Sequence, residues 1–156
     1  MVLVLALAAC EQKIASSLSL GEAVTVNGLE LWVDRFETSQ IIGTSTPRSQ
    51  GKFLLVHVGA RNVRETPTQK PVNVHIRYRG GEVDRSFRLQ LDLGTTDPTH
   101  PSFPYVVDLF PGAQSEGWTG FEVPAGLDPS EVAVLVKVDN KVASWCLTEP
   151  KNQDVC

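Results

Sequence analysis

Four arginines lie close together in the chain, and their type and spacing suit the binding of an anion. Arg77, Arg79, Arg85 and Arg88 flank a glycine pair at 80–81 that predicts a turn between two strands. Side chains on one face of paired strands lie close together, so we expect the four guanidinium groups to converge on a positive patch. Such a patch suits an anionic headgroup, an acidic glycan or an acidic partner protein. The plainer alternative is a solvated strand face whose charge prevents aggregation.

Three histidines are the candidate metal ligands. His57, His75 and His100 lack the His-x-His or carboxylate spacing that would place two ligands on one face of a strand. We interpret each as a satisfied or solvated imidazole, and we expect no metal and no cofactor. A metal-dependent enzyme that uses His57 or His75 stays open as a weaker alternative.

Residue types used in catalysis are present, but they do not form catalytic patterns. Ser115 lies in GAQSEG, which lacks the Gly-x-Ser-x-Gly spacing of a nucleophile and predicts a turn. The carboxylates Glu82 and Asp84 stand beside arginines and are typical of salt-linked surface charge. The net charge of -4 argues against a nucleic-acid partner. The sequence therefore predicts a protein without enzymatic activity.

The first ten residues, MVLVLALAAC, carry the pattern of a bacterial lipoprotein signal. Small residues before Cys10 suit a signal peptidase, and the Cys10 thiol would take the lipid, which removes residues 1–9. The apolar run is short and lacks a basic residue, so we expect the true translation start to lie upstream. Cleavage after Ala9 by an ordinary peptidase, or a buried first strand, are the alternatives. We expect a membrane-anchored protein outside the cytoplasm, in the periplasm or on the cell surface.

The two remaining cysteines fit that location. Cys146 and Cys156 have nine residues between them, a loop that a disulfide closes easily in an oxidising compartment. Two unmodified thiols are the alternative. No CxxC spacing is present, which argues against a redox motif or a zinc site built on thiolates.

Short extended runs separated by turn signals occupy most of the chain. Asn27-Gly28 between two such runs is a strong hairpin signal, because both turn residues must adopt positive φ. No window shows a sustained 3.6-residue period, so we expect about eight strands in an antiparallel, immunoglobulin-like β-sandwich. The expected strands lie at 23–26, 29–36, 51–63, 72–79, 82–93, 105–110, 117–123 and 131–138.

With 156 residues and 17.0 kDa, the chain has room for one compact domain. We divide it into a signal peptide at 1–9, the lipidated cysteine and a polar spacer at 10–20, the sandwich at 21–148 and a tail at 149–156. The three tryptophans, Trp32, Trp118 and Trp145, are expected in or beside the core, although aromatic rings also stack on sugars.

Two segments suggest a family. GKFLLVHVGARNV at 51–63 is followed by LFPGAQSEGWTGFEVPAG at 109–126, and together they resemble the extracytoplasmic telokin-like family of unknown function. Many members of that family are small lipoproteins or secreted antigens with an immunoglobulin-like β-sandwich. The residues that carry the second motif are Leu109, Pro111, Gly112, Gly117, Phe121, Val123 and Pro124. The resemblance implies a fold and a location, but no activity.

The sequence as a whole therefore favours a lipid-anchored binding or protein-interaction module of the cell envelope. Its partners would be the membrane, through the lipid on Cys10, and an envelope protein or an anionic or glycan ligand. A passive envelope spacer or an assembly factor for a neighbouring complex is the alternative.

Overall fold

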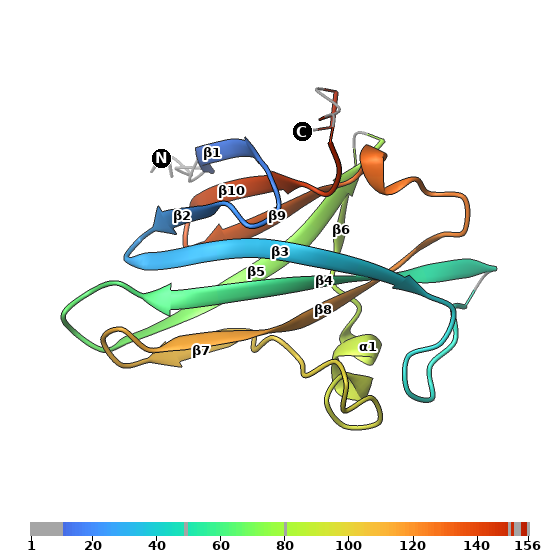
Figure 1. The fold of residues 1–156 in the computed structure, drawn as a ribbon, viewed down its shortest axis with the longest axis horizontal. Coiled ribbons are helices and arrows are strands. Elements are labelled where there is room, and N and C mark those ends of the chain that lie inside the picture. Colours follow the sequence, from blue (N-terminus) through green and yellow to red (C-terminus); the bar gives the residue numbers. More distant parts are fainter. Residues whose placement is uncertain (1–10, 49, 80, 150, 152–153, 156) are drawn as a thin grey trace, which may run out of the picture.

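The computed structural model describes residues 11–48, 50–79, 81–149, 151 and 154–155. Its strands form two sheets packed as layers, with one short helix beneath them (Figure 1). The all-β sandwich expected from the sequence is confirmed. In place of about eight strands, the described chain holds β1 (Gln12–Leu18), β2 (Ala23–Val26), β3 (Leu29–Ser39), β4 (Gly51–Asn62), β5 (Thr68–Tyr78), β6 (Gly81–Asp84), β7 (Val106–Leu109), β8 (Gln114–Pro124), β9 (Ala133–Val138) and β10 (Lys141–Cys146).

One layer is a six-stranded sheet in the order β1-β10-β9-β5-β6, in which β7 also pairs with β5. Strand β1 runs parallel to β10 along its outer edge. It occupies the segment that we expected to be a polar spacer at 10–20. Backbone hydrogen bonds explain the difference, because a ladder satisfies N–H and C=O groups whatever the polarity of the side chains.

The opposite edge of this sheet is divided between two strands. β6 pairs with β5 from His75 to Tyr78, whereas β7 pairs with β5 from Thr68 to Pro71. Over 72–74, β5 has no strand neighbour on this edge within the described chain. We call this interval the split edge.

The second layer is a four-stranded sheet in the order β2-β3-β4-β8. The hairpin predicted at Asn27-Gly28 joins β2 to β3, with φ values of 49° and 82° at the two turn residues. Farther along β3, Val33 pairs with Val58 and Arg35 pairs with His57, so Asp34 is the extra residue of a β-bulge. The bulge turns the Asp34 carboxylate toward the ring of His57 on the neighbouring strand.

The main core lies between the two sheets and is built by alternation along the strands. On β4, Leu54, Val56 and Val58 face inward against residues of the other sheet such as Val136 and Trp145. Each fully buried aliphatic or aromatic side chain of this kind stabilises the fold by about 1.5–3 kcal/mol. Within the described residues, no helix has the length and apolar character needed to cross a membrane.

A second, smaller core lies on the outer face of the four-stranded sheet. Phe53, Leu55 and Trp118 face outward there and are covered by Ile42, Leu89 and Leu93. The covering residues come from the loop after β3 and from α1 (Phe87–Asp92) with the residue that follows it. The outer face is thus capped at one end and open at the other.

Helix α1 corrects the prediction of a strand at 82–93. Only Gly81–Asp84 is extended, and the chain then turns into a six-residue helix capped by Ser86, whose hydroxyl accepts from the backbone N–H of Leu89. Leu89 packs into the space above Gly120, where a β-carbon would stand 3.1 Å from it. Alternation of Phe87, Leu89 and Leu91 suggested a strand, but capping and this docking contact favour one turn of helix.

Candidate functional site

The predicted arginines are not brought together in one patch. Arg77 lies on β5, and its Nη2 donates to the main-chain oxygen of Val155 at 2.7 Å. It lines a small hollow of about 150 Å³ that also contains Glu11 and Glu82. Arg85 follows β6 and lines a different, larger pocket.

Arg79 lines neither of these two hollows. Arg79 occupies the exposed turn after β5 with φ of 49°. Arg88 lies on α1 instead of on a strand, and its side chain falls outside what the structure describes. The expected stripe depended on a continuous strand from 82 to 93, and the turn into α1 breaks it.

The pocket that contains Arg85 lies at the split edge, and we call it the edge pocket. It has a volume of about 550 Å³, within the size range of small-molecule sites. Its walls come from β5, the end of β6, α1 and the segment before β7. The lining residues are Asn73, Val74, His75, Asp84, Arg85, Gln90, Ser102, Phe103, Pro104 and Tyr105.

Arg85 is the arginine that lines the edge pocket. Its Nη2 donates to the carbonyl oxygen of Val72 at 3.0 Å, and the guanidinium lies 4.9 Å from the ring centre of Tyr105. Its Nη1 is buried and has no hydrogen-bond partner among the described residues. Burial lowers the pKa of Arg85, against the opposing effects of Tyr105 and Asp84.

Two further polar groups line the edge pocket. The amide nitrogen of Gln90 donates to Ser102 and to the carbonyl oxygen of Trp118, while its Oε1 is buried and has no partner in the described part of the chain. His75 Nδ1 lies 2.6 Å from an Asp84 carboxylate oxygen. Burial is the main cause that lowers the pKa of His75.

A second depression lies on the outer face of the four-stranded sheet, beside the cap, and we call it the Trp118 hollow. It also has a volume of about 550 Å³. Its centre is Trp118, with the ring of His57 at 5.1 Å and the ring of His100 at 4.9 Å, both edge-on. The lining residues are Arg35, Glu37, His57, Thr99, His100, Pro101, Glu116 and Trp118.

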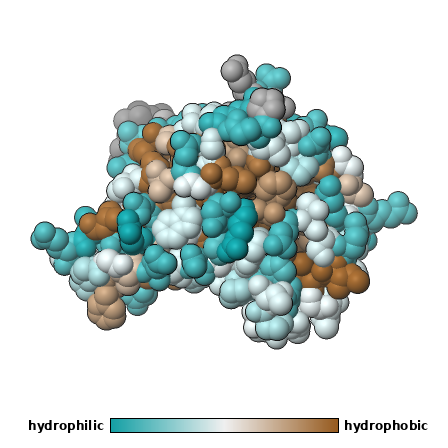
Figure 2. Space-filling model, in the orientation of Figure 1, coloured by the Kyte–Doolittle hydropathy of each residue, from teal (hydrophilic) through white to brown (hydrophobic). Residues whose placement is uncertain are grey.

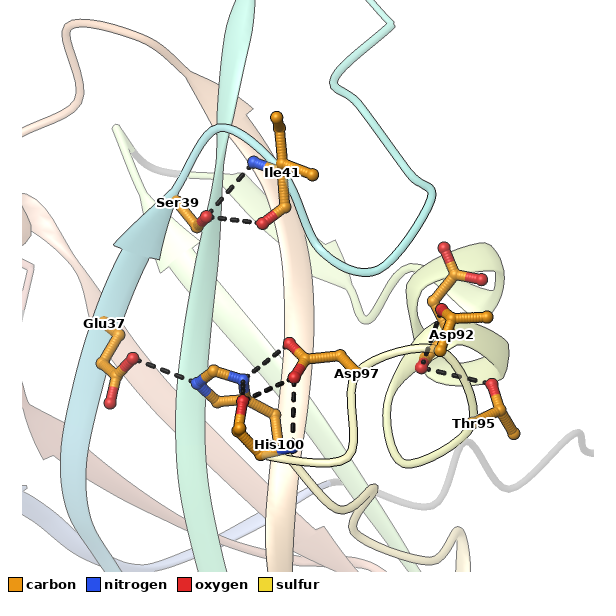
Figure 3. Close-up of polar contacts among 9 residues, drawn as sticks. Glu37, Ser39, Ile41, Asp92, Thr95, Asp97 and His100 are labelled. Atoms are coloured by element: carbon orange, nitrogen blue, oxygen red, sulfur yellow. Dashed lines mark hydrogen bonds and ion pairs between the residues drawn. The ribbon is translucent and has the colours of Figure 1, made fainter.

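Both histidines of the Trp118 hollow are held by carboxylates. His57 Nδ1 lies 2.7 Å from Asp34 Oδ1. His100 bridges two elements, because its Nδ1 lies 2.7 Å from Asp97 Oδ2 and its Nε2 lies 3.1 Å from Glu37 Oε2 on β3 (Figure 3). The bridge fastens the loop that contains Asp97 to the sheet.

The bridge also changes the acidity of its members. Burial acts to lower the pKa of His100, but hydrogen bonds and charge from Glu37 and Asp97 outweigh it and leave the pKa raised. For Asp97, burial acts to raise the pKa, whereas bonds from Thr99 and His100 outweigh it and leave the pKa lowered. Both shifts favour an imidazolium between carboxylates.

The arrangement of these side chains bears on chemistry. Among the described residues, no group of three or more His, Cys, Asp and Glu side chains is placed to hold a metal ion. His57, His75 and His100 each contact a carboxylate through a ring nitrogen, as expected for satisfied imidazoles. The edge pocket, with an apolar wall and a few polar groups, instead suits the binding of a small molecule.

The remaining tryptophans and the cysteines lie at different places in the fold. Trp145 is fully buried in the core, and its indole N–H donates to the carbonyl oxygen of Glu22 at 2.9 Å. Trp32 lies over Gly59 on the open part of the outer face. Cys146 ends β10 and is buried, whereas Cys10 and Cys156 lie outside the described residues.

The sequence analysis predicted neither the edge pocket nor the Trp118 hollow as a site. It named Arg85 but assigned it to a strand hairpin, and it gave no role to Gln90 or Tyr105. Contacts between residues far apart in the chain, such as Glu37 with His100, leave no signal in local spacing. The one usable signal was the Ser86 cap with apolar residues three and seven positions later, which favours a helix over a strand.

Neither a family model nor a curated protein sequence matches the chain. Solved structures do. A conserved hypothetical protein from Bacillus anthracis matches with a TM-score of 0.60 and 13% identity, over 79% of this chain and 90% of that one. The yjhA protein from Bacillus subtilis matches with a TM-score of 0.56 and 14% identity, over 76% and 80%. An uncharacterized β-sandwich protein from Clostridium difficile matches with a TM-score of 0.53 and 11% identity, over 88% of this chain and 97% of that one. The likeness shows the fold, a β-sandwich that is shared with proteins of uncharacterized function.

Proposed function

We propose that this chain is a lipid-anchored, extracytoplasmic binding module that holds a small ligand in the edge pocket and catalyses no reaction. The observation that carries the proposal is the edge pocket itself. It combines about 550 Å³ of space with buried polar atoms of Arg85 and Gln90 that have no partner among the described residues. Buried polar groups are normally satisfied, so unpartnered atoms on two residues that line the pocket favour a ligand that reaches them once the side chains covering them move.

The envelope location is supported by the chain itself. Leu7-Ala8-Ala9-Cys10 matches a lipoprotein processing site, and the segments at 51–63 and 109–126 resemble the telokin-like family of small lipoproteins. Since β1 begins at Gln12, a lipid on Cys10 would hold the sandwich close to the membrane surface instead of on a long tether.

A disulfide between Cys146 and Cys156 belongs to the same proposal. In an oxidising compartment, closing a loop of this length stabilises the fold by about 2–3 kcal/mol. The bond would tie the tail to the end of β10, where Cys146 lies.

The anchor is tested by palmitate labelling of cells that express the protein from its natural gene, so that any upstream start is included, with Cys10→Ala as the matched variant. We expect a labelled, membrane-bound form that disappears in the variant. The disulfide between Cys146 and Cys156 is tested by mass spectrometry, and we expect the intact protein to be lighter than its reduced form by about two hydrogens. Unlabelled protein in the soluble fraction of both strains would reject the anchor.

The ligand site is tested separately, by titrating the protein with 1-octanol while its backbone amide chemical shifts are followed by NMR. Shifts centred on Val74, Phe103 and Tyr105 support the binding module, and their absence favours the passive spacer.

A further inference from the structure

We propose that the ligand of the edge pocket is a small amphipathic anion, a carboxylate with an apolar body, whose head pairs with Arg85. This inference rests on the proposed function, since it names the ligand class of the same pocket. It adds a charge requirement that the pocket alone does not impose.

The charge balance around Arg85 is the first step. The guanidinium is half-buried, and no described carboxylate lies within ion-pair distance of it. Two other partly buried cations of the same sheet do have such partners: Lys70 contacts Asp139 at 2.6 Å, and Lys137 contacts Glu82 at 2.9 Å. A buried charge without a counterion is unfavourable, so an anion placed here gains more than one placed on the surface.

The nearest acidic group does not fill this role. Asp84 lines the edge pocket, but its carboxylate contacts His75 Nδ1 at 2.6 Å, and its side chain is 82% exposed. Its field opposes the effect of burial on the pKa of Arg85 without cancelling it. Arg85 therefore has no direct ion-pair partner among the described carboxylates, although Asp84 lines the same pocket.

The walls define the other end of the ligand. Val74 and Phe103, each 1% exposed, belong to the main core and close the pocket on that side, so the apolar surface open to a ligand comes from Pro104 and Tyr105. Tyr105 is 55% exposed and lies over the guanidinium, so it is the side chain that must turn for a ligand head to reach Nη1. Gln90 Oε1 can only accept hydrogen bonds, so a ligand hydroxyl could donate to it but an anionic head could not.

Other ligand classes fit less well. A cation would be repelled by Arg85, which is always protonated. A peptide strand added at the split edge would need several main-chain groups of β5. Both groups of Val72 are already used, because its N–H donates to Tyr105 and its C=O accepts from Arg85. A compact molecule with one anionic head is the class that remains.

The experiment compares three probes of equal chain length, octanoate, 1-octanol and octylamine, by calorimetric titration of the whole chain carrying Cys10→Ala. A charge-assisted bond in a partly buried site predicts octanoate binding about tenfold tighter than octanol, with octylamine weakest. Arg85→Gln should lower the affinity for octanoate to that for octanol. Arg79→Gln is the matched control, because Arg79 is exposed and lines neither hollow, and it should change nothing.

The outcomes separate the two proposals. Octanol that binds as tightly as octanoate, or a preference for octanoate that survives Arg85→Gln, overturns the inference and leaves the binding module standing. No binding by any probe overturns both. If Arg85→Gln does not fold, the wild type decides the question: the preference for octanoate must vanish as the pH falls below the pKa of the probe itself, and a preference that persists there contradicts the pairing.

Discussion

The His100 bridge should make the stability of the protein depend on pH in a defined direction. His100 joins Asp97 in its own loop to Glu37 on β3, and its side chain is 18% exposed. Its pKa in the folded protein is raised above the ordinary 6.5. A raised folded-state pKa means that the stabilisation is fully present below about pH 6.5 and is lost as the pH rises through the folded-state pKa.

The perturbation is His100→Gln, which keeps a polar side chain of similar size but removes the titratable charge. A hydrogen bond to a charged partner contributes about 1.5–3 kcal/mol. Because Glu37 is 53% exposed, we discount that bond and expect a total loss of about 2 kcal/mol at pH 5.5. For a domain of this size, that loss lowers the Tm by about 5 °C.

The assay is urea unfolding of wild type and variant at several values between pH 5.5 and 8.5, with the difference in unfolding free energy as the readout. The difference is needed because His75 acts in the opposite direction. Burial lowers the pKa of His75, so its protonation destabilises the fold as the pH falls below about 6.5. Asp97 does not interfere, because its pKa is lowered from 3.8.

We expect the difference between wild type and His100→Gln to be largest at pH 5.5 and to shrink toward pH 8.5. His75→Gln serves as the opposite control, because it should gain stability relative to wild type as the pH falls. A difference for His100→Gln that stays constant across the range would refute the ionic bridge and leave only packing against Trp118.

Two substitutions test the packing of the sheets. Gly59→Ala should displace the Trp32 ring, because a β-carbon would stand 2.0 Å from it. We expect a red-shifted indole emission and an unfolding free energy lower by about 1 kcal/mol. Gly126→Ala is the control and should change neither quantity, because a β-carbon there has nothing within 4 Å. Trp145→Phe should destabilise the fold by about 2–3 kcal/mol in thermal and urea unfolding, since it removes both core volume and the bond to Glu22. Wild-type stability in that variant would contradict both contributions, the burial of the indole ring in the core and its hydrogen bond to Glu22.

The sequence alone determined the class of fold. Apolar residues recur at every second position of the run at 72–76, and Val72, Val74 and Ile76 are all buried in the main core between the sheets. The Asn27-Gly28 turn was equally readable, since positive φ at both residues is a local requirement. The lipoprotein signal at Cys10 stays a prediction, because it lies outside the described residues.

Only the tertiary structure decided where the sites are. Whether residues 82–93 form a strand or turn into α1 depends on Leu89 docking above Gly120, a contact across the fold that local alternation does not encode. That turn separates Arg85 from Arg77 and opens the edge pocket beside the split edge of β5. The His100 bridge likewise needs Glu37, which is 63 residues away in the chain. Local pattern specifies which residues are buried in strands, whereas side chains meet in a site because of long-range packing.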